Sequence, residues 1–312
     1  FNKPKLNTLN KDTVSFTSTP HSNKNIQNAV KFGYEIFEHQ RKDKDFNIVQ
    51  YLKSKEKDIT ILPMSELAKV KCDACNYSAF ISSGMSEDFD YQNIKFYIDI
   101  NSKDNSMTMK LVNSMEVAHE YTHLEQTKDK KNKEFYKNLC NNDREYLTLL
   151  TGIGDGIFSL FDTHTQSDFV SKTFNIVDIL LIKQYGKAIP QPRNITEKDL
   201  LKANKMESKE EFNIYMLLLY ETIFPKIIEM LLEENINVSE EVQEAFYSCI
   251  NKGITLEKIK KDVKLYMSHS AENEQEAYTT ESELARKAMK TKSNLNINAF
   301  VFYYKLLKDA LK

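Results

Sequence analysis

The chain has 312 residues, of which 41% are hydrophobic and 28% are charged, and 43 basic and 45 acidic residues leave a net charge of -2. This length is enough to bury a substantial core. With 7 glycines, 6 prolines and no Trp, the composition argues against a collagen-like, disordered or turn-rich all-β protein. The balanced charge provides no overall field to hold nucleic acid. We therefore expect a globular protein without a nucleic-acid partner.

Membrane insertion is also excluded by the sequence pattern. The most apolar stretch, residues 215–232, contains Glu221, Pro225, Lys226 and Glu229, which predicts a buried helix and no membrane span. The N-terminal residues are polar and lack the hydrophobic region of a signal peptide, so we expect a cytoplasmic protein or export without a standard signal. The frequent Lys and Asn residues are typical of a bacterial protein encoded by an AT-rich genome.

The first third of the chain predicts a tail, two helices and a small sheet. Residues 1–23 are polar and aperiodic, which indicates a flexible tail. Apolar residues recur every three or four positions from Lys24 to the charged run near residue 42, and this spacing predicts an amphipathic helix. A short helix follows near 46–55. Three β-like segments come next, at 58–63, 76–82 and 93–101.

After Asn101 the pattern is almost entirely helical. We expect helices near 105–128, 133–139, 142–162, 167–186, 196–203, 208–234, 239–251, 255–268, 273–290 and 296–311. The predicted fold class is therefore α+β, with a small N-terminal sheet and a large, mostly helical body. We expect one domain over residues 24–312, with a helical insertion at about 142–251.

One segment carries recognisable chemistry. In the sequence MEVAHEYTHLEQ, His119, Glu120 and His123 form the motif HExxH. On a helix, residues four apart lie on one face, so both imidazoles can bind the same Zn²⁺ ion. Glu120 can then accept a proton from the zinc-bound water and pass it to the leaving group. A surface helix with two incidental histidines is the alternative interpretation.

The third zinc ligand has several candidates. Glu274, in the sequence EQEAY, begins an ExxA frame in which a small residue allows close packing on the HExxH helix. Glu276 is an alternative ligand or a hydrogen-bond acceptor behind a liganding histidine. Glu145, 22 positions after His123, is a third candidate. The alternative interpretation for each of them is a glutamate that is exposed to solvent on a helix and binds no metal.

Further side chains are candidates to assist catalysis. Tyr278 and His269 flank the distal glutamates, and each could donate a hydrogen bond to an oxyanion. His164, at an expected helix break, is a weaker candidate ligand or acid. The pair Cys72 and Cys75 spells CxxC but has no second pair for a structural zinc, so we expect two cysteines near a strand.

A family resemblance follows from these motifs. The order of the strand FYIDIN, the HExxH helix and a distal ExxA helix resembles the zincin-type metallopeptidases with a glutamate as third ligand, the gluzincins. Within that group, this chain is most similar to small bacterial metallopeptidases with a Gln soon after the second His, here Gln126. The resemblance covers about 94–128 and 268–290. The separation of 151 residues between His123 and Glu274 is longer than is usual in that family.

The resemblance implies a zincin-like active-site helix and a zinc cofactor. His119, His123 and Glu274 would be the ligands and Glu120 the general base. Residues 96–101 would form the edge strand with which an extended peptide or protein substrate pairs. The expected function is therefore that of a zinc-dependent metallopeptidase. The alternatives are a zinc amidohydrolase acting on a non-peptide amide, or a non-catalytic helical interaction protein with a structural or vestigial metal site.

Overall fold

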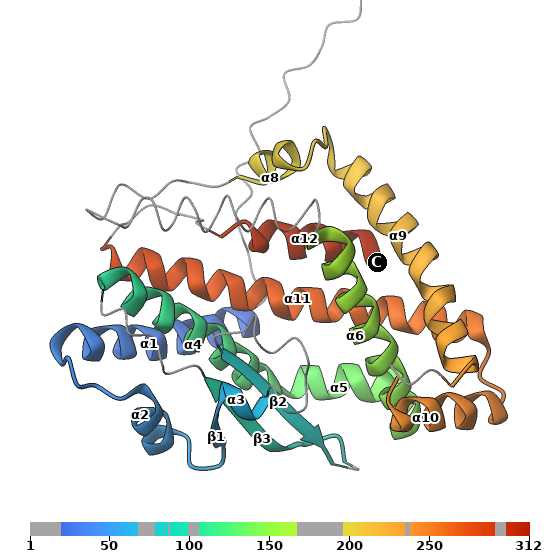
Figure 1. Ribbon diagram of the computed structural model, residues 1–312, viewed down its shortest axis with the longest axis horizontal. Helices are drawn as coiled ribbons and strands as arrows, with labels where there is room; N and C mark the ends of the chain where they lie inside the picture. The colour runs from blue at the N-terminus through green and yellow to red at the C-terminus, as the bar shows by residue number, and fades with distance from the viewer. Residues whose placement is uncertain are drawn as a thin grey trace, which may run out of the picture.

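The computed structural model describes residues 20–67, 79–86, 88–98, 106–166, 196–234, 238–290 and 298–312, and the side chains of these residues except 20–23, 108, 159–166 and 203. The predicted helix at 167–186, the CxxC pair and most of the predicted tail lie outside the described residues. The predicted α+β class is confirmed, because a small sheet near the N-terminus accompanies a large helical body (Figure 1). None of the described helices is both long and apolar enough to span a membrane.

The N-terminal part combines two helices, a short turn of helix and three strands. In chain order these are α1 (Pro20–Lys42), α2 (Ile48–Lys55), β1 (Thr60–Pro63), α3 (Met64–Leu67), β2 (Ala79–Met85) and β3 (Tyr91–Ile98). The first helix starts four residues before the predicted boundary at Lys24. The sheet has the order β1-β3-β2, in which β1 is parallel and β2 antiparallel to β3.

The strand expected at the edge of the sheet is in the middle of it. Phe96 pairs with Ile61 of β1 on one side and with Ile81 of β2 on the other. The expectation that residues 96–101 form a substrate-binding edge is therefore wrong for 96–98, while 99–101 lie outside the described residues. Alternating apolar residues indicate which face of a strand is buried, but they do not indicate which strands pair with it within the sheet. Among the described residues, β2 and β1 are the edge strands.

The helical body follows in the second half of the chain. Its elements are α4 (Met107–Thr127), α5 (Lys130–Leu139), α6 (Arg144–Gln166), α8 (Glu197–Ala203), α9 (Lys209–Leu232), α10 (Glu240–Asn251), α11 (Leu256–Ala288) and α12 (Phe300–Leu311). Figure 1 shows α11 running through the centre of the molecule, with α1 and α4 along one part and α6, α9 and α10 toward the other. The helices of the predicted insertion share their core with α11 and α12.

The long helix α11 replaces two predicted helices, 255–268 and 273–290. Residues 268–274 contain neither Gly nor Pro, and Ala and Glu in this stretch favour helix. Tertiary contacts also hold the stretch in place, because Met267 and Ala271 are fully buried and the Ser268 hydroxyl donates to the Lys308 carbonyl of α12. The polar residues that suggested a break are therefore accommodated within one continuous helix.

Close packing brings α11 against α4. Gly33 of α1 lies where both helices meet, and a Cβ atom added there would be 2.6 Å from the Ala118 Cβ and 2.8 Å from a Leu284 methyl. Beside this contact, the buried hydroxyl of Thr122 in α4 lies 2.8 Å from that of Thr280 in α11. This short interhelical distance allows side chains of α4 and α11 to converge on one point.

Candidate metal centre

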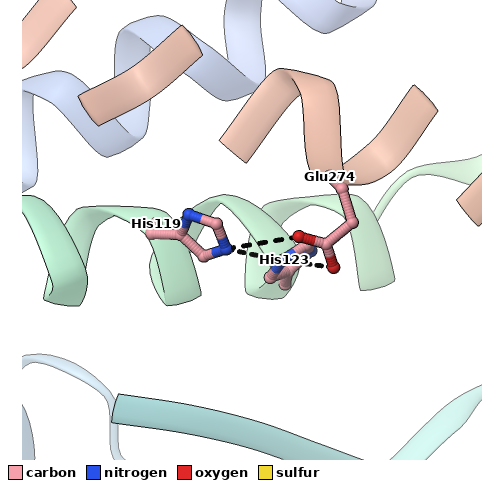
Figure 2. A group of neighbouring side chains, drawn as sticks. All are labelled: His119, His123 and Glu274. Carbon is pink, nitrogen blue, oxygen red and sulfur yellow. Dashed lines mark hydrogen bonds and ion pairs between the residues drawn. The ribbon is translucent and has the colours of Figure 1, made fainter. Parts of the chain in front are cut away.

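The two histidines of the HExxH motif and one distal glutamate converge at the α4–α11 contact. His119 and His123 lie on one face of α4, one turn apart, and Glu274 points toward them from α11 (Figure 2). The two histidine Nε2 atoms are 3.3 Å apart. One oxygen of Glu274 is 3.5 Å from the Nε2 of His119, and the other is 3.4 Å from the Nε2 of His123.

These three side chains form a group that could hold a metal ion. One donor atom from each lies within 4.8 Å of the other two. The exposed fraction rises from 11% for the His119 side chain to 18% for His123 and 34% for Glu274, so the glutamate is the most accessible of the three. The structure therefore brings together the three residues predicted as ligands.

The charges within the group shift the pKa values of its side chains in the direction opposite to the shift caused by burial. Burial alone lowers the pKa of His119, but the carboxylates of Glu274 and Glu281 outweigh it and raise the pKa well above its usual value. Burial would raise the pKa of Glu274, yet the adjacent His123 and His119 lower it far below its usual value. A carboxylate thus faces two basic imidazoles, and a metal ion would take the place of their protons.

Each histidine has a second polar partner behind it. The Nδ1 atom of His119 is 2.9 Å from a carboxylate oxygen of Glu281, an ion-pair distance without the alignment of a hydrogen bond. The other oxygen of Glu281 accepts a hydrogen bond from the Asn298 side chain. The Nδ1 atom of His123 is 2.9 Å from the amide oxygen of Gln126. A hydrogen-bonded partner such as Gln126 fixes the orientation of a liganding imidazole and leaves its Nε2 for the metal, whereas Glu281 places a negative charge behind His119.

Glu281 was not among the candidates taken from the sequence. A signal for it was present, since Glu281 follows Glu274 by seven residues, which is two helical turns and therefore the same face. Gln126 was noted in the sequence only as part of the family resemblance. Its contacts assign it a definite place behind His123.

Glu120 lies beside the group, between α4 and the edge strand β2. Burial raises the pKa of its carboxyl, while His119, His123 and the backbone N–H of Ile81 in β2 act in the opposite direction. A carboxyl group with a raised pKa is a better proton acceptor than an ordinary glutamate. The position is therefore suited to a general base.

The remaining glutamate candidates have other partners. Glu276 accepts a hydrogen bond from the Gln126 amide at 3.0 Å, so it lies behind His123 and does not replace Glu274. Glu145 is in the first turn of α6, where its half-exposed carboxylate contacts Ser248 of α10 and Lys252, the residue that follows α10. The expectation that either could be the third ligand is not supported by these contacts.

The two proposed oxyanion donors differ in their surroundings. The Tyr278 ring packs edge-on against the His119 ring, with centroids 4.5 Å apart, and stacks on Phe300. His269 instead stacks on Phe135 and bonds through Nε2 to the Asn132 side chain. Tyr278 therefore borders the metal group and stays a candidate, whereas His269 is held elsewhere. The side chain of His164 lies outside the described residues.

Comparisons with known proteins do not add to this description. No protein-family model, no curated protein and no solved structure gives a significant match to this chain.

Proposed function

We propose that the protein is a zinc-dependent peptidase whose metal ligands are His119, His123 and Glu274. The observation that carries this proposal is the spacing of the donor atoms. Ligand atoms about 2.0–2.1 Å from a tetrahedral zinc ion lie about 3.3–3.4 Å from one another. The two histidine Nε2 atoms have this spacing, at 3.3 Å, and each lies 3.4–3.5 Å from a different oxygen of Glu274. One donor atom from each of the three side chains lies within 4.8 Å of the other two.

The number of ligands favours a catalytic site over a structural one. Structural zinc sites have four protein ligands, whereas catalytic sites have three and leave one position for water or substrate. Among the residues that the structure describes, the group has three members. A zinc ion bound there would act as a Lewis acid that polarises a carbonyl and makes water more nucleophilic.

Glu120 would carry the protons of the reaction. Its carboxylate accepts a proton from the attacking water and returns it to the departing amine. Tyr278 is our candidate for a hydrogen bond to the oxyanion, because its ring contacts His119. Both assignments follow from the positions of these side chains beside the ligand group.

The strand β2 supports a peptide as the substrate. Among the described residues, β3 pairs with one side of β2 and no strand pairs with the other. The N–H of Ile81 that contacts Glu120 must point away from β3, and alternate residues of a strand direct their backbone groups to the same side. Ala79 therefore offers its N–H and C=O to an extended chain, and Ile81 offers its C=O, next to Glu120.

The test combines metal content with peptide cleavage. We expect about one zinc per chain, measured by mass spectrometry on protein purified without chelator or metal-affinity resin, and loss of zinc in His119→Ala. A mixture of unstructured peptides should be cleaved by the zinc-loaded wild type. Glu120→Gln should retain zinc while its turnover falls by about 10²–10⁴-fold.

Two outcomes would contradict the proposal. One is a folded wild-type protein that takes up no zinc even after incubation with it. The other is equal cleavage by wild type and Glu120→Gln. If the zinc-loaded protein hydrolyses small acyl amides and leaves peptides intact, the amidohydrolase alternative replaces the peptidase.

A further inference from the structure

Gln126 occupies an unusual place at the α4–α11 contact. It lies in the last turn of α4, three residues after His123, and it is 4% exposed. Its amide oxygen is 2.9 Å from the His123 Nδ1 atom. Its amide nitrogen donates to the backbone carbonyl of Asn273 and to the carboxylate of Glu276, each at 3.0 Å.

These contacts determine the orientation of the amide. Both partners of the amide nitrogen are oxygens that can only accept, so the nitrogen of Gln126 must face α11. Its oxygen then faces His123 and can only accept from it. His123 therefore carries a hydrogen on Nδ1, which leaves Nε2, on the side of Glu274 and His119, as the nitrogen that would bind the metal.

The same amide also holds the other helix. Asn273 directly precedes Glu274, and Glu276 follows it by two residues. One side chain thus orients a candidate ligand of α4 and anchors α11 on both sides of the candidate ligand that α11 supplies. We propose that Gln126 is a positioning residue that sets the tautomer of His123 and the place of Glu274, and thereby the affinity and geometry of metal binding. This inference depends on the proposed metal site.

The choice of an amide at this position has an electrostatic reason. His119 has the carboxylate of Glu281 behind it, but the group behind His123 must also meet the carboxylate of Glu276. A second carboxylate 3.0 Å from Glu276 would be repelled. Gln supplies an acceptor for the imidazole and a donor for the carboxylate in one side chain.

Three variants separate these roles. Gln126→Met keeps the size of the side chain and removes all three hydrogen bonds. Gln126→Glu keeps the acceptor for His123 but places two carboxylates in contact. The exchange Gln126→Glu with Glu276→Gln restores an acceptor behind His123 and a donor across the helix contact, and loses the bond to the Asn273 carbonyl.

The readouts are zinc affinity, measured by competition with a chromophoric chelator, and the visible spectrum of the Co²⁺-loaded protein. We expect Gln126→Met to bind zinc about 10–100-fold more weakly and to alter the Co²⁺ spectrum. Gln126→Glu should also bind weakly, whereas the exchange variant should recover most of the affinity and the wild-type spectrum.

The chain contains a matched control in Gln40. This residue is also buried, and its amide nitrogen donates to the Ser114 hydroxyl and to the Lys110 carbonyl, so it bridges α1 to α4. It contacts none of the three candidate ligands. Gln40→Met should lower the thermal midpoint while zinc affinity stays within about twofold of wild type, because effects at separate sites are independent.

The outcomes distinguish this inference from the proposed function. Wild-type affinity and spectrum in Gln126→Met would overturn the positioning role and leave the metal site intact. An exchange variant as weak as Gln126→Glu would overturn it as well, and this comparison decides the matter if Gln126→Met does not fold. A folded wild type that binds neither Zn²⁺ nor Co²⁺ would instead refute the proposed function, and the inference with it.

Discussion

The two halves of α11 differ in the polar contacts that they make. In the first half, most buried side chains are apolar and belong to the main core with α6, α9 and α12; they include Ile259, Val263, Tyr266, Met267 and Ala271. The second half faces α4 with Glu274, Glu276, Thr280 and Glu281, and each of these has a polar partner there or near it.

This difference has consequences for what each half can tolerate. An apolar contact depends on volume and shape, so its loss lowers stability wherever it occurs. A buried polar contact depends on the identity of the partner, because an unpaired buried group has a large free-energy cost. We therefore expect substitutions at the buried apolar positions of the first half to act on stability, and those at the polar positions of the second half that face α4 to act on metal binding.

The largest effect is expected for Glu274→Gln. This variant keeps the shape of the side chain but replaces the carboxylate ligand, so zinc affinity should fall more than about 100-fold, beyond the effect of changing a partner behind a ligand. Glu145→Gln, at the exposed contact with Lys252, is the control and should retain zinc. Zinc per chain after dialysis measures the effect, and loss of zinc from the control alone would move the ligand to Glu145.

The second prediction concerns the stability contributed by the first, mainly apolar half of α11. Met267 is fully buried in α11, and Met267→Ala should lower the free energy of unfolding by about 2–5 kcal/mol. Leu265→Ala, two residues away and 37% exposed, should change it by less than about 0.5 kcal/mol. Urea unfolding measures both. The folded Met267→Ala protein should still bind one zinc, and its failure to do so would show that the two halves are not separate.

A pair of glycines tests the close contact of α1 with both helices. Gly33→Ala places a Cβ 2.6 Å from Ala118, the neighbour of His119, and should destabilise by about 1–3 kcal/mol and also weaken zinc binding. Gly156 in α6 has its nearest contact at 3.6 Å, so Gly156→Ala should stabilise by about 0.5–1 kcal/mol. Thermal and urea unfolding distinguish the two, and equal effects would exclude a tight contact at Gly33.

The smallest effect concerns pH. Burial lowers the pKa of His269 to about 4, whereas an unfolded histidine has a pKa of about 6.5. Between these values the unfolded chain binds a proton that the folded protein does not. Stability therefore falls as the pH is lowered from 6.5 toward 4, by up to about 2 kcal/mol at pH 5.

The variant His269→Gln isolates this contribution. It retains an N–H donor for Asn132 but does not titrate in this range. Urea unfolding of both proteins at pH 7 and pH 5 gives the comparison. A wild type and a variant that lose the same stability between these two pH values would show that His269 is not the source.

Local patterns account for most of what the sequence predicted correctly. The helices near 105–128, 208–234 and 239–251 follow from apolar spacing together with Ser106, Ser208 and Ser239, whose side chains cap α4, α9 and α10. The HExxH spacing places His119 and His123 together on any helix. These features depend on residues within a few positions of one another, which is why they can be read without a structure.

The predictions that were wrong or left open concern contacts between segments that are distant in the sequence. The order of the strands depends on which segments pair, and alternation at Phe96 is the same in a central and in an edge strand. The continuity of α11 through Ser268 depends on its packing against α12. Likewise, the sequence alone left Glu274, Glu276 and Glu145 open as third ligand, because each lies on a helix and none is near His123 in the chain.

The amino-acid sequence thus determined the helical body, the capped helix α4 and the pair of imidazoles on one of its faces, since helix periodicity and capping are local properties. Only the tertiary structure decided that Glu274 completes the group, that Glu281 and Gln126 lie behind the two histidines, and that β2 borders the site. Those relations arise from the packing of α11 on α4 across about 150 residues of chain, and packing is set by shape and burial summed over the whole molecule.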